Sequence, residues 1–153
     1  MSTAPAAKVV ERGRGKTIML YGVRFDCKVT SADSGGDLAA LEVTIPPRTL
    51  VKPHNHSRED EFTHVLAGTV GDRVVEASEG ASMVKPRGTP HAMWNVGPDP
   101  ARVLEVVAPG GLEDYFEELA PVLRDYDALA ERYGLTIEDD WIEELERTYG
   151  VKL

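Results

Sequence analysis

Apolar and polar residues alternate along the first two thirds of the chain, in short runs separated by Gly, Pro and Asp. In residues 23–29 the odd positions are apolar and the even positions are charged, and residues 41–45 repeat the alternation. A period of two is typical of a strand with one buried face, because successive side chains point to opposite sides. The pattern predicts strands over residues 17–21, 23–29, 38–45, 61–66, 68–76, 82–84, 91–94 and 102–107. Frequent short strands of this kind indicate an all-β sandwich or barrel.

After Gly111 the apolar period changes to that of a helix. Apolar residues recur at steps of three and four, which predicts helices with one buried face. Pro121 cannot supply a backbone donor, so we expect a break or a sharp kink there, with Pro121 in the first turn of the second helix. Gly134 is then expected to end that helix. The residues of the apolar stripe are Leu112, Tyr115, Phe116, Leu119, Val122, Leu123, Tyr126, Leu129, Ala130 and Tyr133.

A last helix is predicted near the end of the chain. Thr136 is expected to cap it and Gly150 to end it. Its apolar side carries Ile137, Trp141, Ile142, Leu145 and Tyr149. The chain is therefore expected to divide into a β-rich part at residues 1–110 and a C-terminal helical extension at residues 111–153, packed on the β-rich part or on a dimer partner.

Composition and charge narrow the classes of partner. The 153 residues, of which 42% are apolar, are enough for one soluble domain. Acidic residues outnumber basic ones by 26 to 17, and the net charge of -9 argues against nucleic acid or an anionic membrane as partner. A small molecule is the expected ligand. Cys27 is the only cysteine, no apolar run is long enough for a membrane span, and residues 1–8 lack the apolar stretch of a signal peptide; a cytoplasmic location is therefore expected.

All four histidines lie in two short stretches, and the spacing of three of them suits one metal ion. His54 and His56 are two residues apart in an extended segment, so both side chains leave the same face. Glu61 can add a carboxylate, and His91, which follows a turn at residues 86–88, can add a third imidazole from another strand. His64 is three residues from Glu61 and is expected on the opposite face of that strand, pointing outward or into an interface.

The same stretches carry the two motifs of the cupin superfamily, which the chain resembles over roughly residues 39–107. Residues 54–68 fit H-x-H, four residues, E, six residues, G; residues 80–95 fit G, five residues, P-x-G, two residues, H, three residues, N. The spacing of the first motif selects Glu61 over Glu59 and Asp60, which are then loop charges. Arg48 stands where the first motif usually has Gly. Because Gly permits a positive φ, we expect the turn at residues 46–49 to be built differently.

Looser similarities at residues 34–36, 108–111 and 116–119 resemble the single-domain (monocupin) group that is similar to quercetin dioxygenases. The resemblance implies a small antiparallel β-barrel of jelly-roll type, a homodimer, and a metal site inside the barrel made by His54, His56, Glu61 and His91. These ligands suit one divalent transition metal ion; Fe(II) is favoured, and Mn, Ni, Co, Cu or Zn also fit. Three neutral imidazoles and one carboxylate leave a net charge of about +1, and six-coordinate geometry leaves open positions for an anionic substrate oxygen and for dioxygen or water.

Three functions fit such a site. The first is a dioxygenase-type oxidoreductase acting on a small enolisable or phenolic metabolite, with Glu61 accepting a proton from the substrate hydroxyl as the catalytic residue. The second is a non-redox Lewis-acid reaction, such as that of an isomerase, decarboxylase or cyclase. The third is binding of a small molecule without catalysis, because the fold and the metal shell are common to all three.

Strand parity predicts a mostly apolar substrate pocket, the usual character of a site for an aromatic or hydrophobic metabolite. Cys27 is expected to be a small buried hydrophobe rather than a reactive thiol. Trp94 is expected outside the pocket, and no Lys or Arg can be placed in it from the sequence. The expected lining residues are Phe25, Cys27, Val43, Thr63, Val65 and Met93.

Overall fold

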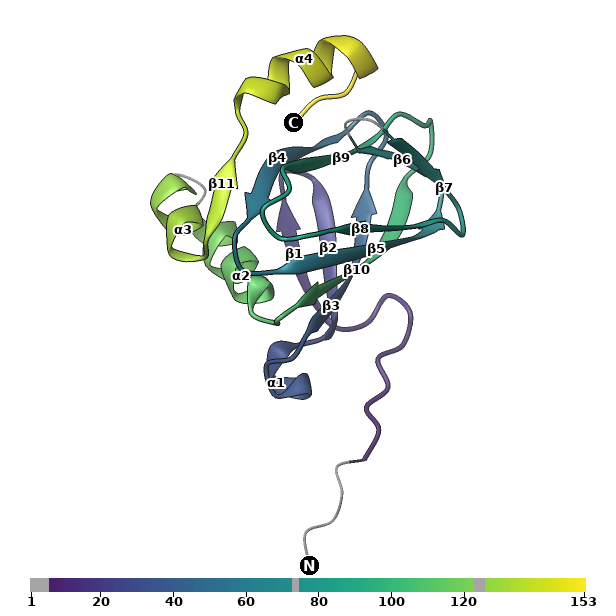
Figure 1. Ribbon diagram of the computed structural model, residues 1–153. Helices are drawn as coiled ribbons and strands as arrows, with labels where there is room; N and C mark the ends of the chain where they lie inside the picture. The colour runs from purple at the N-terminus through teal and green to yellow at the C-terminus, as the bar shows by residue number, and fades with distance from the viewer. Residues whose placement is uncertain (1–5, 73–74, 123–125) are drawn as a thin grey trace, which may run out of the picture.

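The structure is a computed structural model that describes residues 6–72, 75–122 and 126–153. Two antiparallel sheets face each other and form a barrel, with helices at one side and at the top in the view of Figure 1. The first sheet has the order β1 (Lys16–Leu20), β2 (Val23–Val29), β3 (Ala39–Ile45), β10 (Ala101–Ala108), β5 (Asp60–Ala67) and β8 (Ser82–Lys85). The second has the order β11 (Leu135–Ile137), β4 (Leu50–His56), β9 (His91–Asn95), β6 (Thr69–Asp72) and β7 (Val75–Ser78). The expected all-β antiparallel barrel with C-terminal helices is confirmed.

The apolar positions of the alternating sequence are the buried positions of the strands, and the polar positions are more exposed. In β3, Leu41, Val43 and Ile45 point inward and are at most 2% exposed, while Glu42 and Thr44 are only partly buried. The barrel core is thus built from every second residue of the first sheet, as a period of two requires.

The strands differ from those expected in three places, the first being β4, which was expected only as an extended segment around His54 and His56. Residues 68–76 form a hairpin of β6 and β7 rather than one strand, and of these residues 73 and 74 lie outside the described part. Thr136 does not cap a helix. It lies in β11, which pairs with β4 through Leu135 opposite His56 and Ile137 opposite His54. The β-branched Thr136 and Ile137 suit a strand, and the open edge of β4 supplies the partner that the sequence does not show.

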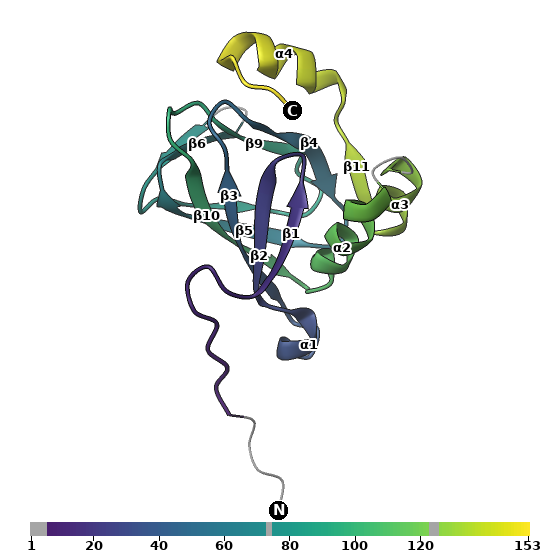
Figure 2. The same ribbon diagram turned by 180° about the vertical axis from the view of Figure 1, so that it is seen from behind.

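The apolar stripe after Gly111 packs on the barrel of the same chain. Helix α2 (Leu112–Val122) runs beside β1 (Figure 2). Leu112, Tyr115 and Leu119 are buried in the barrel core. Pro121 lies in the last turn of α2, so the expectation that it starts the next helix was wrong. Leu123 lies outside the described residues, as do the side chains of Val122 and Tyr126.

Helix α3 (Tyr126–Arg132) is followed by Gly134 at a φ of 74°, and α4 (Asp140–Tyr149) ends at Gly150 with a φ of 64°, so both expected helix ends are confirmed. Helix α4 covers the outer face of the second sheet. There the Tyr149 ring stacks on Trp94 with the centroids 4.5 Å apart, and Trp94 is 1% exposed. Trp94 is therefore outside the barrel interior, as expected, but it is not in solvent.

Arg48 adopts the conformation that Gly would. Its φ is 58°, so the expectation of a differently built turn was wrong. A non-Gly residue in the left-handed region is strained, and the surrounding structure compensates. The Leu50 N–H donates to the Lys152 carbonyl over 2.6 Å and the Lys152 N–H donates to the Arg48 carbonyl over 2.8 Å, so the C-terminal segment holds the turn.

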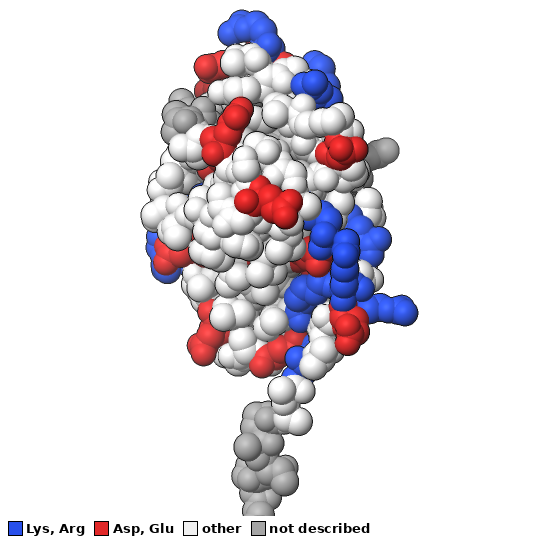
Figure 3. Space-filling view, turned by 90° about the vertical axis from the view of Figure 1, so that its right-hand side faces the viewer, with Lys and Arg blue, Asp and Glu red and all other residues white. Residues whose placement is uncertain are grey.

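Two further features concern the outside of the molecule. In Figure 3, Lys and Arg side chains gather next to the segment that leads to the N terminus, whereas Asp and Glu are scattered over the same face. A short helix, α1 (Ser31–Ser34), is capped by Thr30. Among the described helices, none is both long and apolar enough to span a membrane.

Candidate metal centre

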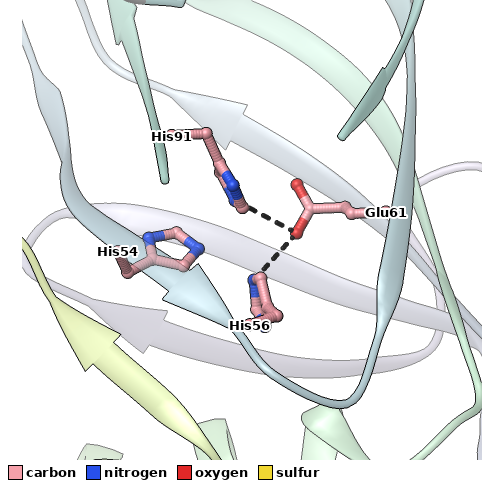
Figure 4. Close-up of side chains that lie close together, drawn as sticks. All are labelled: His54, His56, Glu61 and His91. Carbon is pink, nitrogen blue, oxygen red and sulfur yellow. Dashed lines mark ion pairs between the residues drawn. The ribbon is translucent and has the colours of Figure 1, made fainter. Parts of the chain in front are cut away.

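Four side chains from three strands meet inside the barrel (Figure 4). His54 and His56 come from β4, Glu61 from β5 and His91 from β9. One ligand atom from each lies within 4.8 Å of the others. The strand register produces this convergence, because His54 lies directly opposite His91 in the β4–β9 pair. The four residues that the two sequence motifs select are therefore brought together.

The turn before His91 is fixed by a contact with the same site. Gly88 has a φ of 79°, and its N–H donates to the His56 carbonyl over 2.7 Å. Only Gly adopts this conformation at little cost, which explains the glycine in the P-x-G part of the second motif. The turn thereby ties the start of β9 to the end of β4.

Backbone carbonyls orient two of the imidazoles. His54 Nδ1 lies 2.6 Å from the Lys52 carbonyl oxygen, and His91 Nδ1 lies 2.9 Å from the Thr89 carbonyl oxygen. A carbonyl only accepts hydrogen bonds, so each Nδ1 carries the proton and each Nε2 keeps its lone pair. This arrangement is the usual second contact of metal-binding histidines.

The carboxylate of Glu61 lies among the imidazoles. Its Oε2 atom is 3.2 Å from His56 Nε2 and 3.7 Å from His91 Nε2. Burial would raise the pKa of Glu61, but the charge of Lys85 and the two imidazoles together hold it well below its usual range. Glu61 is therefore ionised and presents a negative charge to the centre of the cluster.

The histidines respond to burial in two ways. Burial, followed by His91 and His56, holds the pKa of His54 well below its ordinary value. Burial would also lower the pKa of His56, but Glu59 and Glu61 outweigh it and raise that pKa to about 9. His56 lies between the two carboxylates, with Nδ1 3.4 Å from Glu59.

A divalent cation fits this set of donors. The Nε2 atoms of His56 and His91 are buried, and within the described part of the chain they have the contacts with Glu61 Oε2 but no hydrogen bond, although buried polar atoms normally have one. A metal ion bound by His54, His56, Glu61 and His91 would satisfy them, and nitrogen ligands combined with one carboxylate suit transition metals.

Comparison with known proteins agrees with this geometry. Residues 41–107 match the family model described as a cupin domain. The match covers less than half of the chain. No match was found among curated proteins.

Solved structures show the same fold. KdgF from Halomonas sp. has a TM-score of 0.60 and 20% identity, over 70% of this chain and 99% of that one. The polyketide cyclase RemF from Streptomyces resistomycificus has a TM-score of 0.60 and 24% identity, over 67% and 80%. A predicted oxalate decarboxylase from Thermotoga maritima has a TM-score of 0.61 and 18% identity, over 67% and 99%. Similarity at these identities establishes the cupin fold alone.

The residues that the sequence analysis excluded from the metal ligands, His64, Asp60 and Glu59, lie outside the cluster. His64 points to the outer face of the cupin barrel, where Nδ1 lies 2.8 Å from Ser82 Oγ. Asp60 is half-exposed and pairs with Arg87. Glu59 lies in the loop between β4 and β5, as expected, but it is buried there, with 5% exposed, and lies against His56.

Two charged residues in the wall were missed. Lys85 of β8 forms a buried ion pair with Glu61 and lies 3.5 Å from Glu105 of β10. Glu105 occupies an inward position between Val103 and Val107, so strand parity could have revealed it. Lys85 directly precedes Pro86 and resembles a turn charge, although it lies opposite Glu61 in the β5–β8 register.

A cavity of about 100 Å³ adjoins the cluster. Phe25, Val43 and Met93 line it, as expected. Cys27, Thr63 and Val65 are buried but are not lining residues, because their side chains pack into the surrounding wall. Burial, followed by the charge of Glu113, raises the pKa of the Cys27 thiol to about 11, which fits an inert thiol.

Helix α2 closes part of the cavity, and its mouth reaches the surface. Leu112, Tyr115, Phe116 and Leu119 contribute apolar walls. Tyr21 and Leu153 also line the cavity, although they are 51% and 46% exposed. An apolar chamber with a charged end and an open mouth is a common form of small-molecule site.

Proposed function

We propose that this chain is a metal-dependent cupin enzyme that acts on a compact metabolite bearing an ionisable oxygen. The observation that carries the proposal is the convergence of His54, His56, Glu61 and His91 within 4.8 Å at the end of an apolar cavity. A bound divalent transition metal would supply a positive centre for an anionic oxygen. The protein would hold the ion, exclude water with its apolar walls and orient the substrate.

The cavity favours a small substrate. Its volume of about 100 Å³ is below that of an engineered cavity of about 150 Å³ that holds benzene. One ring or an enolisable head group therefore fills the closed part, and any longer portion extends to the mouth between Tyr21 and Leu153. Phe25 and Phe116, with ring centroids 4.7 Å apart, offer an aromatic wall.

The reaction that we propose is dioxygenation of a phenolic or enolisable, and in some cases aromatic, metabolite, with Fe(II) as the favoured metal. The two cupin motifs and the resemblance to quercetin dioxygenase-like monocupins support it. Glu61 would accept the proton of the substrate hydroxyl, because its carboxylate is ionised and its Oε2 faces the metal position.

A non-redox reaction is the second candidate, and a specific observation favours it. Lys85 and Glu105 line the same cavity, so exchangeable protons lie next to the place where a substrate anion would bind. Isomerisation, decarboxylation or cyclisation needs such groups but no dioxygen. Among the structural neighbours are proteins described as a polyketide cyclase and a predicted oxalate decarboxylase. Binding without catalysis is the third candidate.

One experiment separates the three. The protein is purified without added metal and its metal content is measured; it is then loaded with Fe(II) and screened for oxygen uptake with phenolic and diketone compounds. Uptake that disappears on chelation supports the dioxygenase. Turnover without uptake supports the Lewis-acid reaction. Substrate binding without turnover leaves only the binding protein, and a chain that takes up no first-row metal contradicts all three.

We also propose a homodimer in the cytoplasm. The helix stripe is already covered by its own barrel, but Phe62 and Val84 lie opposite each other on the outer face of β5 and β8 and are 38% and 65% exposed. A second copy would cover them. The single, unpaired Cys27 fits a reducing compartment. Light scattering that finds only monomer contradicts the dimer.

A further inference from the structure

The two oxygens of Glu61 have different partners. Oε2 faces the imidazoles, 3.2 Å from His56 Nε2 and 3.7 Å from His91 Nε2. Oε1 forms the ion pair with Lys85 Nζ. Lys85 is therefore placed to decide how many oxygens Glu61 can offer to a cation between the imidazoles.

Lys85 is itself held from the far side. Glu105 Oε1 lies 3.5 Å from Lys85 Nζ, and Glu105 Oε2 accepts a hydrogen bond of 2.8 Å from Thr63 Oγ1. The strand register lines these groups up, with Glu61 opposite Lys85 and Thr63 opposite Glu105. All four residues are at most 6% exposed. A buried chain of this kind fixes side-chain positions more strictly than a solvated pair does.

We propose that Lys85 is a positioning residue that restricts Glu61 to one oxygen toward the metal. The inference rests on the proposed function, because it requires a metal at the cluster. With Oε1 retained by Lys85, the ion would have three imidazole nitrogens and one carboxylate oxygen, and the remaining positions stay open for substrate. The ammonium charge also offsets the charge of Glu61, so the centre attracts anions more strongly.

Co(II) and azide are suitable probes, since Co(II) reports its coordination number by visible absorption and azide is a small anion. In Lys85→Met, Glu61 is expected to add its second oxygen. The visible bands should weaken, Co(II) should bind about tenfold more tightly because a neighbouring cation is gone, and azide should bind about tenfold more weakly. Lys85→Arg should restore the spectrum of the unsubstituted protein.

Controls separate positioning from a general structural effect. Lys28 also pairs with a glutamate, Glu42, and is 14% exposed on the outer face of the same sheet; Lys28→Met should change none of the three measurements. In a Glu61→Gln background, adding Lys85→Met should leave the spectrum unchanged, because the group through which Lys85 acts is gone. If Lys85→Met does not fold, as judged by circular dichroism, Lys85→Gln is measured in its place.

The outcomes are distinct. Unchanged bands and unchanged azide affinity in folded Lys85→Met or Lys85→Gln overturn the inference and leave the proposed function standing. The same spectral change in the Glu61→Gln background also overturns it. An unsubstituted protein that binds no Co(II) overturns the proposed function, and the inference with it.

Discussion

Two ion pairs connect the start of β5 to the end of β8 and to the turn that follows β8, and they lie on opposite sides of the barrel wall. Asp60 and Arg87 meet outside, with Oδ2 and Nη2 2.8 Å apart and about half of each side chain exposed, 49% and 51%. Glu61 and Lys85 meet inside, where the side chains are only 8% and 4% exposed. Asp60 and Glu61 are adjacent in β5, yet one carboxylate is in water and the other is in the barrel interior.

The difference shows that burial, rather than contact geometry, gives a charge its chemical role. Water screens the Asp60–Arg87 pair and competes for it, so it contributes little to stability. The inner pair cannot be solvated, so removal of one partner leaves an uncompensated charge. The interior of this cupin barrel therefore contains charges that depend on one another, and such dependence is typical of functional sites.

The largest contrast is expected in stability, when Lys85 of the inner ion pair and Arg87 of the outer ion pair are each replaced by Met. Lys85→Met should lower the free energy of unfolding of the metal-free protein by about 3 kcal/mol or more, because Glu61 and Glu105 lose their buried cation. Arg87→Met should leave the urea midpoint unchanged. Urea denaturation followed by circular dichroism measures both. Equal shifts in the two variants would show that burial does not distinguish the pairs.

The second-largest contrast is expected in metal binding, between an inward-facing histidine, His56, and an outward-facing one, His64. His56→Ala removes an inward imidazole and should weaken transition-metal binding by about 100-fold or more, since changes to outer contacts alone cost about 10- to 100-fold. His64→Ala, on the outer face, should leave metal occupancy unchanged. Competition with a chromophoric chelator measures the affinities. Loss of metal in His64→Ala instead would refute the assignment of faces in β5.

A smaller effect is expected at the second sheet, whose outer face is covered. A Cβ added at Gly71 would collide with the Trp94 ring. Gly71→Ala should therefore destabilise the protein by about 1–3 kcal/mol and displace Trp94. Gly97→Ala is the control, because its added Cβ would lie 3.2 Å from Asn95 Oδ1 and 3.9 Å from the Asp99 carbonyl oxygen, with no contact under 3.0 Å. Thermal unfolding with tryptophan fluorescence follows both, and equal stability of the two variants would contradict the tight packing under α4.

Strand alternation made much of the fold predictable, because a strand with one buried face must alternate. Strand β4 shows why some elements were missed. Its sequence includes Lys52, Pro53, His54 and His56, so the functional residues themselves replace the apolar alternation. β11 was missed for another reason, since its three residues are a strand only because β4 offers an edge.

The cluster itself could be predicted because motif spacing determines strand and face. Lys85 and Glu105 could not be assigned with it, since their role arises from register between strands distant in sequence. A charge at an inward position, such as Glu105 among apolar neighbours, is visible in the sequence. The residue that Glu105 contacts cannot be read from the sequence, because the alternation of apolar and polar residues does not determine which strands pair or in which register.

The smallest predicted effect concerns the outer pair alone. Hydrogen bonds from the Arg87 side chain and backbone lower the pKa of Asp60 to about 2. In Arg87→Ala that pKa should rise toward its ordinary value of 3.8 without reaching it, because the backbone N–H at position 87 still donates. Since the pKa is lowered in the folded state, any stabilisation is present above the unfolded pKa and is lost as pH falls toward 2. An NMR titration of the Asp60 carboxyl measures the shift. An unchanged pKa in Arg87→Ala would assign the effect to the backbone donor, and the comparison would then contrast an ion pair inside the barrel with a turn outside it.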